Sequence, residues 1–282
     1  MNITPGTFLL SVNGEKLSLE NHPYRAMLNL VGEEVRLEVK SSGDKKSRQV
    51  IVKTIAAETS HWYRDWVEAN REYVHKQSKG KVGYVHIPNM SPVGYAEFHR
   101  YFLAEFDYEG MIIDVRQNGG GHVSPLLLEK LARKRFGFSK TRWMGNSPKP
   151  QQSPRGPMVA LTNEGAGSDG DIFSHGFKML KLGKLIGTRT WGGVIGIWPR
   201  NSLVDGTVTT QPEFSNWFFD VGYGVENYGT DPDITIEIKP QDYASGKDPQ
   251  MDRGIKEVLA EIKKNPGKVP DFEKDRPSLK LP

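Results

Sequence analysis

The first 57 residues alternate short apolar and polar stretches in a pattern that predicts a small β-rich unit with one helix. Val35–Val39 places apolar residues at every second position, as a half-buried strand does, and Phe8–Val12 and Val50–Val52 have the same strand character. Asn13-Gly14 predicts a tight turn after the first of these strands. His22-Pro23 opens the helical stretch, so we expect a mixed α+β unit here.

The periodicity then becomes helical, because Trp62, Trp66, Ala69 and Tyr73 fall on one side of a helix and predict the apolar face of an amphipathic segment. From residue 81 strands alternate with helices, and repeated strand–turn–helix units predict parallel strands joined by right-handed crossovers. We predict strands at Val82–Ile87, Met111–Val115, Met158–Thr162, Lys184–Thr188 and Ile234–Ile238, and helices at Tyr95–Phe106, Val123–Arg135 and Ser168–Leu182. A hairpin is predicted at Asp205-Gly206, and a last helix carries Ile255, Val258, Leu259 and Ile262.

These patterns divide the chain into three parts. Residues 1–57 form the small unit, residues 58–264 form a larger α/β core with a linking helix at its start, and residues 265–282 form a Pro- and Lys-rich tail with little periodicity. A length of 282 residues fits one large domain or a large and a small one, and such a chain can bury a sizeable core.

Composition narrows the chemistry that the chain can perform. The absence of cysteine excludes disulfides, a thiol nucleophile and thiolate metal sites, and the seven histidines show no metal-binding spacing. A formal net charge of +4, spread along the chain, is too weak to imply nucleic-acid binding. We also find no apolar run long enough to span a membrane and no signal-peptide pattern, and therefore expect a cytoplasmic protein.

Two predicted strand-to-helix turns could carry chemistry. The first contains Gly119-Gly120-Gly121, where bare backbone amides before a helix could bind an anion or a developing oxyanion. A tight turn with close helix–strand packing is the alternative interpretation. The second turn places Ser168 after small residues at a sharp corner that would suit a nucleophile. A serine that opens a helix is also a common cap, and Ser168 with Asp171 resembles a capping box.

A third candidate lies in the glycine-framed loop around Glu226, where the carboxylate could orient a catalytic partner or could simply be solvated. Among the histidines, His175 lies two helical turns after Ser168, too far along the same helix to take its proton. His122 follows the glycine run, and we expect it to pack or cap there.

Four segments occur in an order that is specific to one family: Asp114–Gly121, Asn163–Phe173, Gly187–Gly193 and Val225–Asp233. Together they closely resemble the tricorn-type core of the tail-specific (C-terminal processing) serine peptidases. The resemblance extends over roughly residues 6–262 and is far more specific than any single motif. Residues 6–55 resemble the later part of the PDZ domain that this family carries. The resemblance therefore implies a crotonase-like (ClpP/crotonase) α/β core with a curved, mostly parallel sheet and flanking helices, preceded by a partial PDZ-like unit.

The resemblance also implies roles for individual residues. Ser168 matches the nucleophile, and the backbone amides of Gly121 and Asp169 match the oxyanion hole. Glu226 matches the acidic residue that supports a Ser–His dyad. In this family the general-base histidine precedes the PDZ domain, and this chain starts inside the PDZ-like unit. We therefore expect that histidine to be missing, and we interpret Ser60 of Ser60-His61 as a helix cap rather than part of a substitute.

The first hypothesis is thus a serine endopeptidase core that forms an acyl-enzyme at Ser168 and is weak or inactive as this chain alone. It would need no metal or organic cofactor and would act on peptides or unfolded proteins, and family resemblance allows a homo-oligomer. The alternative is a catalytically incomplete peptide-binding module. A crotonase-type acyl-thioester enzyme that binds coenzyme A would use the same paired amides, but the Ser-Asp-Gly-Asp motif argues against it.

Overall fold

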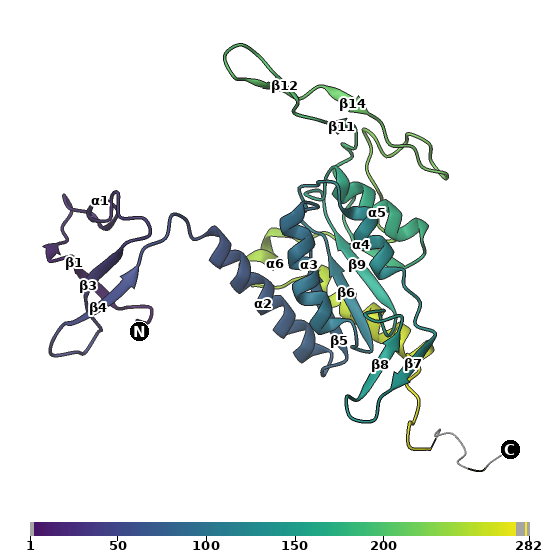
Figure 1. Ribbon diagram of the computed structural model, residues 1–282. Coiled ribbons are helices and arrows are strands. Elements are labelled where there is room, and N and C mark those ends of the chain that lie inside the picture. Colours follow the sequence, from purple (N-terminus) through teal and green to yellow (C-terminus); the bar gives the residue numbers. More distant parts are fainter. Residues whose placement is uncertain (1–2, 275–279, 281–282) are drawn as a thin grey trace. The chain divides into compact units, whose positions relative to one another are not determined.

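The computed structural model describes residues 3–274 and residue 280, so part of the predicted tail lies outside the described residues. The chain divides into two compact units, Met1–Trp66 and Val67–Pro282 (Figure 1). Within the described residues, we find no helix with the length and apolar character needed to cross a membrane.

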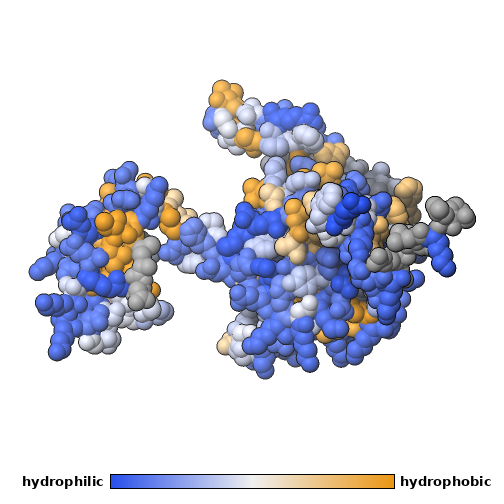
Figure 2. Space-filling model, turned by 60° about the horizontal axis from the view of Figure 1, so that its bottom comes forward, coloured by the Kyte–Doolittle hydropathy of each residue, from blue (hydrophilic) through white to orange (hydrophobic). Residues whose placement is uncertain are grey.

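The first unit is built on a four-stranded antiparallel sheet in the order β2-β1-β3-β4. Its elements are β1 (Phe8–Val12), β2 (Glu15–Lys16), α1 (Pro23–Ala26), β3 (Glu34–Lys40) and β4 (Arg48–Lys53). The predicted strands and the Asn13-Gly14 turn are confirmed. The alternation buries Val12, Val35, Val39 and Val50 on one side, whereas α1 is a single turn that buries no residue. Figure 2 shows a hydrophobic patch on this unit, whereas most of the surface in that view is hydrophilic.

Helix α2 (Thr59–Gln77) is present as predicted, but its apolar face was predicted wrongly. Val67 and Val74 are its buried residues, whereas Trp66 and Tyr73 are 42% and 38% exposed. The prediction failed because polar residues of α2, and not only apolar ones, point toward the core. On the side that faces the core, Arg71 Nε and His75 Nε2 each lie 2.8 Å from the carboxylate of Glu105, which is only 1% exposed.

The second unit contains a five-stranded parallel sheet in the order β15-β10-β9-β6-β5, which confirms the parallel arrangement. The strands are β5 (Val82–His86), β6 (Gly110–Asp114), β9 (Met158–Thr162), β10 (Gly183–Gly187) and β15 (Ile234–Thr235). Every residue of the first three is buried, as expected for strands covered on both faces. The predicted strand at 234–238 is shortened to two residues.

Helices cover both faces of this sheet (Figure 1). They are α3 (Pro92–Glu105), α4 (Ser124–Leu131), α5 (Asp169–Met179) and α7 (Pro249–Lys264), and a short helix, α6 (Pro240–Ala244), precedes α7 and buries none of its residues. Helix α3 packs against β5. Its Phe98 and Phe102 are fully buried, and their rings are stacked on each other. Helix α7, yellow-green and behind the sheet in Figure 1, approaches it at Gly254, where an added Cβ would lie 3.2 Å from a methyl carbon of Leu161. The predicted helices α3, α4, α5 and α7 are therefore confirmed, with α4 ending earlier than expected.

Two excursions leave the α/β core. One is the hairpin of β7 (Gly137–Lys140) and β8 (Asn146–Lys149), which the sequence pattern did not predict. The other is a projecting arm built from β11 (Gly196–Ile197), β12 (Asn201–Ser202), β13 (Val208–Thr209) and β14 (Pro212–Phe214) (Figure 1). The antiparallel pair β12–β13 confirms the predicted hairpin at Asp205-Gly206.

Candidate active site

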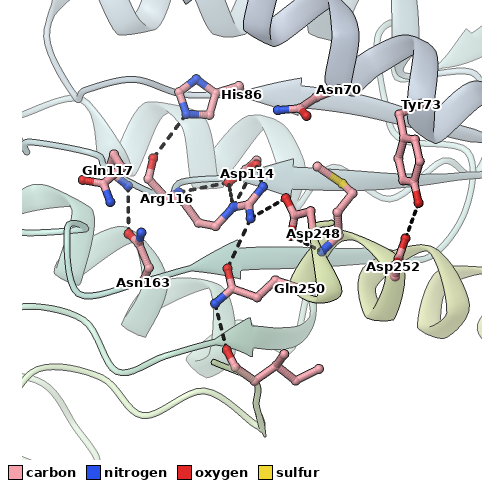
Figure 3. Close-up of polar contacts among 12 residues, drawn as sticks. Asn70, Tyr73, His86, Asp114, Arg116, Gln117, Asn163, Asp248, Gln250 and Asp252 are labelled. Atoms are coloured by element: carbon pink, nitrogen blue, oxygen red, sulfur yellow. Dashed lines mark hydrogen bonds and ion pairs between the residues drawn. The ribbon is translucent and has the colours of Figure 1, made fainter. Parts of the chain in front are cut away.

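The first corner is the turn between the end of β6 and the start of α4, residues 115–123. The buried guanidinium of Arg116 holds it in place. Arg116 is 5% exposed and its Nη2 lies 2.7 Å from Oδ2 of Asp114, which is fully buried (Figure 3). Its Nη1 donates to Asp248 Oδ2 at 2.8 Å and to Gln250 Oε1 at 3.2 Å. Asp248 is the N-cap of α7, because its Oδ1 accepts from the backbone of Met251. Arg116 therefore connects the first corner to the N-terminus of α7.

Burial and the neighbouring charges together shift the pKa values of the groups in this cluster. Burial by itself raises the pKa of the Asp114 carboxyl, but the charge and hydrogen bonds of Arg116 outweigh it, so the pKa lies below the usual value. Burial lowers the pKa of Arg116, but Asp114 and Asp248 more than reverse this effect and leave it raised. His86, whose Nε2 lies 3.2 Å from the Arg116 carbonyl oxygen, has a lowered pKa because it is buried. We therefore expect Asp114 and Arg116 to be ionised and His86 neutral at pH 7.

The second corner joins β9 to α5 and contains Ser168. This residue has φ 55° and ψ −120°, a backbone conformation that non-glycine residues rarely adopt. Ser168 occupies the N-cap position of α5, but its side chain makes no capping hydrogen bond, so the capping role considered for its hydroxyl was wrong. The carboxylate of Asp169 caps a different helix instead, since its Oδ2 accepts from the Ser124 amide at 2.9 Å and its Oδ1 from the Ser124 hydroxyl. Ser168 is thus strained and half-exposed, with a hydroxyl that does not serve the helix.

The two corners converge, as the sequence interpretation required. The Gly167 amide donates to the Asn118 carbonyl oxygen at 2.9 Å. A Cβ added to Gly120 would lie 2.5 Å from Ser168 Cβ and 3.1 Å from the Asp169 nitrogen, so only glycine permits this approach. Gly120 also has φ +84°, which favours glycine independently.

A cavity of about 360 Å³ opens at the meeting point of the corners. Ser168, Gly121 and Asp169 all line it. Its other lining residues are largely apolar: His122, Ser124, Pro125, Ile172, Val194, Gly196, Ile197, Phe214 and Asn216. Since Ser124 is bonded to Asp169 and Asn216 Nδ2 donates to the Val194 carbonyl at 2.6 Å, most of the polar lining is already engaged within the protein.

Glu226 contacts the wall of this cavity. Its Oε2 accepts from the backbone amides of Val194 at 2.7 Å and Ile195 at 2.8 Å. The same segment is held from the other end by Asp171, whose Oδ1 accepts from the Gly192 amide at 2.8 Å. Burial raises the pKa of Asp171, and its Oδ2 is buried without a hydrogen-bond partner among the described residues. Two carboxylates from different elements thus anchor the segment that faces Ser168.

Of the two histidines considered near Ser168, His122 lines the cavity and His175 does not. His175 is 8% exposed, with its Nε2 3.0 Å from Asp220 Oδ1, so it is engaged away from Ser168 as predicted. His122 is exposed, lines the cavity and stacks on Trp198 with ring centroids 5.8 Å apart. Ser60 lies inside α2 rather than at its cap, with its hydroxyl 3.3 Å from His61 Nδ1, so the cap interpretation of Ser60 was wrong.

The described residues hold no group of three or more His, Cys, Asp or Glu side chains arranged to bind a metal ion. The groups gathered at this cavity are a strained serine, backbone amides from two corners and carboxylates that hold the surrounding segments.

The sequence interpretation missed the residues that join the corners. Asn163 Oδ1 accepts from the Gln117 amide at 2.8 Å, and the main-chain oxygen of Asn118 accepts from the Gly167 amide while its Nδ2 donates to the Ile87 carbonyl at 2.7 Å, after β5. The available signal was an asparagine two residues before a glycine at the end of a buried strand, a pattern typical of side-chain-stabilised turns.

Comparison with known families agrees with this geometry. Residues 81–236 match peptidase family S41, and residues 1–57 match the tricorn protease PDZ domain. The chain therefore belongs to peptidase family S41, and the resemblance stated from its motifs is confirmed.

Individual relatives show that the chain is similar to tricorn proteases over most of its length. The chain is 51% identical over 262 residues to the tricorn protease of Thermoplasma acidophilum, which covers 93% of this chain and 24% of that protein. It is 49% identical to the tricorn protease homolog of Saccharolobus solfataricus, with the same two coverages. A solved crystal structure of the tricorn protease superposes with a TM-score of 0.87 at 50% identity, covering 93% of this chain and 26% of that chain. The chain thus spans about a quarter of the length of these relatives.

Proposed function

We propose that residues 58–264 are the core of a serine endopeptidase in which Ser168 is the nucleophile. The observation that carries the proposal is the Ser168 corner: a serine at φ 55°, with no capping bond, beside a cavity and against a glycine-rich turn. Backbone strain of this kind persists where the surrounding structure imposes it, and it is concentrated at functional sites. We further propose that the α/β core is of the crotonase-like type.

The oxyanion hole is assigned to the backbone amides of Gly121 and Asp169. Met90 donates to the Gly120 carbonyl and accepts from the His122 amide, so the N–H of Gly121, between them, is directed away from Met90. Asp169 is the first residue of α5, where the backbone N–H has no partner within the helix. Each donor of such a pair is worth about 2.7–4 kcal/mol in the transition state.

Catalysis would proceed in two steps. The Ser168 Oγ attacks the peptide carbonyl carbon, its proton passes to a general base, and the oxygen that becomes negative is held by the two amides. The C–N bond then breaks as the base returns the proton to the leaving amine, which leaves an acyl-enzyme at Ser168. Water, deprotonated by the same base, attacks the acyl carbon; the bond from this carbon to Ser168 Oγ breaks, Oγ takes the proton back from the base, and the second product is released as a carboxylic acid. In this scheme Glu226 supports the base while it anchors Val194 and Ile195.

We propose that the general base is a histidine outside this chain, supplied by an upstream segment or another chain. His175 is engaged with Asp220. His122 is the remaining alternative, because it lines the cavity with Ser168. The substrate is a peptide or unfolded protein, and the apolar cavity lining favours an apolar side chain next to the cleaved bond. A homo-oligomer stays a prediction from family resemblance.

The test is covalent labelling with a fluorophosphonate probe together with hydrolysis of a fluorogenic peptide library, carried out on this chain alone and on the product of its complete coding region. We expect labelling of Ser168, and loss of labelling and hydrolysis in Ser168→Ala. Hydrolysis that survives Ser168→Ala would refute the proposal, whereas peptide binding by calorimetry with no labelling would favour the binding-module alternative. Loss of hydrolysis by this chain alone in His122→Ala would assign the base to His122 instead.

A further inference from the structure

Asn163 occupies the point where the two corners separate from the sheet. The backbone amide of Val115 donates to Leu161 O at 2.9 Å, as the last regular bond of the β6–β9 ladder. The next bond of a parallel ladder would run from the Gln117 amide to the main-chain oxygen of Asn163. The side-chain oxygen takes that place, since Gln117 N donates to Asn163 Oδ1 at 2.8 Å (Figure 3).

The same oxygen also holds the Ser168 corner. The Gly165 amide donates to Asn163 Oδ1 at 3.2 Å, which closes a turn stabilised by the asparagine side chain. Ala166 N donates to the main-chain oxygen of Asn163 at 2.9 Å, so this main-chain oxygen supports the serine corner rather than the sheet. One buried side-chain atom is therefore bonded to the backbones of both corners.

Both corners need such support, because each contains a non-glycine residue in the left-handed region. Gln117 has φ 59° and Ser168 has φ 55°. Each of these conformations is unfavourable for a residue other than glycine and relaxes unless neighbouring bonds hold it. The bond from Gln117 to Asn163 lies at the first strained residue, and the Gly165 bond lies three residues before the second.

We propose that Asn163 is a positioning residue that sets the spacing of the two corners, so that the amides of Gly121 and Asp169 point at one carbonyl oxygen. The inference rests on the proposed function, because it concerns the oxyanion hole of that reaction. Asn163 itself contacts no substrate in this scheme. It acts by bonding the main chain on each side of the hole.

Two variants separate this role from simple stabilisation. Asn163→Ala removes the shared acceptor, whereas Asn163→Asp keeps an acceptor oxygen in either protonation state. Glu164, Glu237 and Tyr243 line a neighbouring cavity together with position 163. The carboxyl group that Asn163→Asp introduces offers an acceptor oxygen to the amides of Gln117 and Gly165 whether or not it is ionised.

We expect Asn163→Ala to lower kcat for peptide hydrolysis and the rate of fluorophosphonate labelling by about 10–100-fold, with KM changed less than about twofold. The reason is that loss of a whole oxyanion donor costs about 10²–10³, and misdirection of both donors costs part of that. Asn163→Asp should stay within about threefold of the wild type. Asn146→Ala, at an exposed hairpin asparagine, is the matched control and should change neither quantity.

Amide hydrogen exchange tests the inference independently of activity. In Asn163→Ala the amides of Gln117 and Gly165 should lose protection together, whereas Asn163→Asp should keep it. Wild-type kinetics in Asn163→Ala, equal losses in the Ala and Asp variants, or unchanged exchange at both amides would overturn the inference. If neither this chain nor the product of its complete coding region shows labelling or hydrolysis that depends on Ser168, the proposed function fails, and the exchange result alone then decides whether Asn163 joins the corners.

Discussion

Replacement of the buried guanidinium in Arg116→Met tests how the first corner is held. The change removes the partner of Asp114, which has no exposed surface, and the link to Asp248 at the start of α7. Removal of one member of a buried ion pair costs about 3–5 kcal/mol, because the remaining charge is left without compensation. For a unit of this size about 2–4 °C of melting temperature is lost per kcal/mol, so we expect the second unit to melt on the order of 10 °C lower.

The pH dependence of this loss gives a sharper test. In the wild type the pKa of Asp114 is lowered, so its contribution is present above the unfolded value of about 3.9 and is lost as the pH falls through the folded value. Without Arg116, burial remains and raises the pKa of Asp114. That contribution is present below about pH 3.9 and is lost as the pH rises. The stability gap between the two proteins should therefore widen by about 1.4 kcal/mol per pH unit above pH 4, until Asp114 ionises in the variant.

Urea unfolding at several pH values between 4 and 7 measures this gap. Arg133→Met is the matched control, because Arg133 pairs at the surface with Glu129 at 3.5 Å and should change stability by less than about 0.5 kcal/mol. A gap that is independent of pH, or a loss no larger than that of the control, would refute the assignment of Arg116 as the compensating charge.

Other positions give shorter tests. Gly120→Ala should slow Ser168 labelling at least tenfold and destabilise by about 2–4 kcal/mol, since its Cβ would lie 2.5 Å from Ser168 Cβ; wild-type labelling rates would contradict the close approach. Ser168→Gly should raise the free energy of unfolding by about 1 kcal/mol over Ser168→Ala, because glycine tolerates φ 55°, and equal urea midpoints would argue against strain. Glu226→Gln keeps an acceptor for two amides, so its melting temperature should hold while kcat falls; unchanged kcat would limit Glu226 to anchoring. Val74→Ala should cost about 2–3 kcal/mol in urea unfolding and exposed Val93→Ala less than about 0.5, and similar losses would contradict the observed face of α2.

Local pattern was sufficient for most elements of the fold. Continuous apolar runs such as Met158–Thr162 predicted buried parallel strands, because a strand covered on both faces must be apolar on both faces. The glycine run and the small residues before Ser168 marked both corners, since only such residues permit sharp turns and close backbone approach. The position of each corner along the chain can therefore be read without coordinates.

The pairing of those corners depends on contacts between residues far apart in the chain. Gly120 and Ser168 meet because β6 and β9 are neighbours in register, with Asp114 opposite Leu161, and no local pattern specifies that register. The buried side of α2 could not be predicted from hydrophobicity, because its polar residues are compensated by Glu105 of another helix. Local periodicity records what each segment needs to bury, whereas the partner that compensates a buried charge or completes a hydrogen bond is defined only when the chain folds.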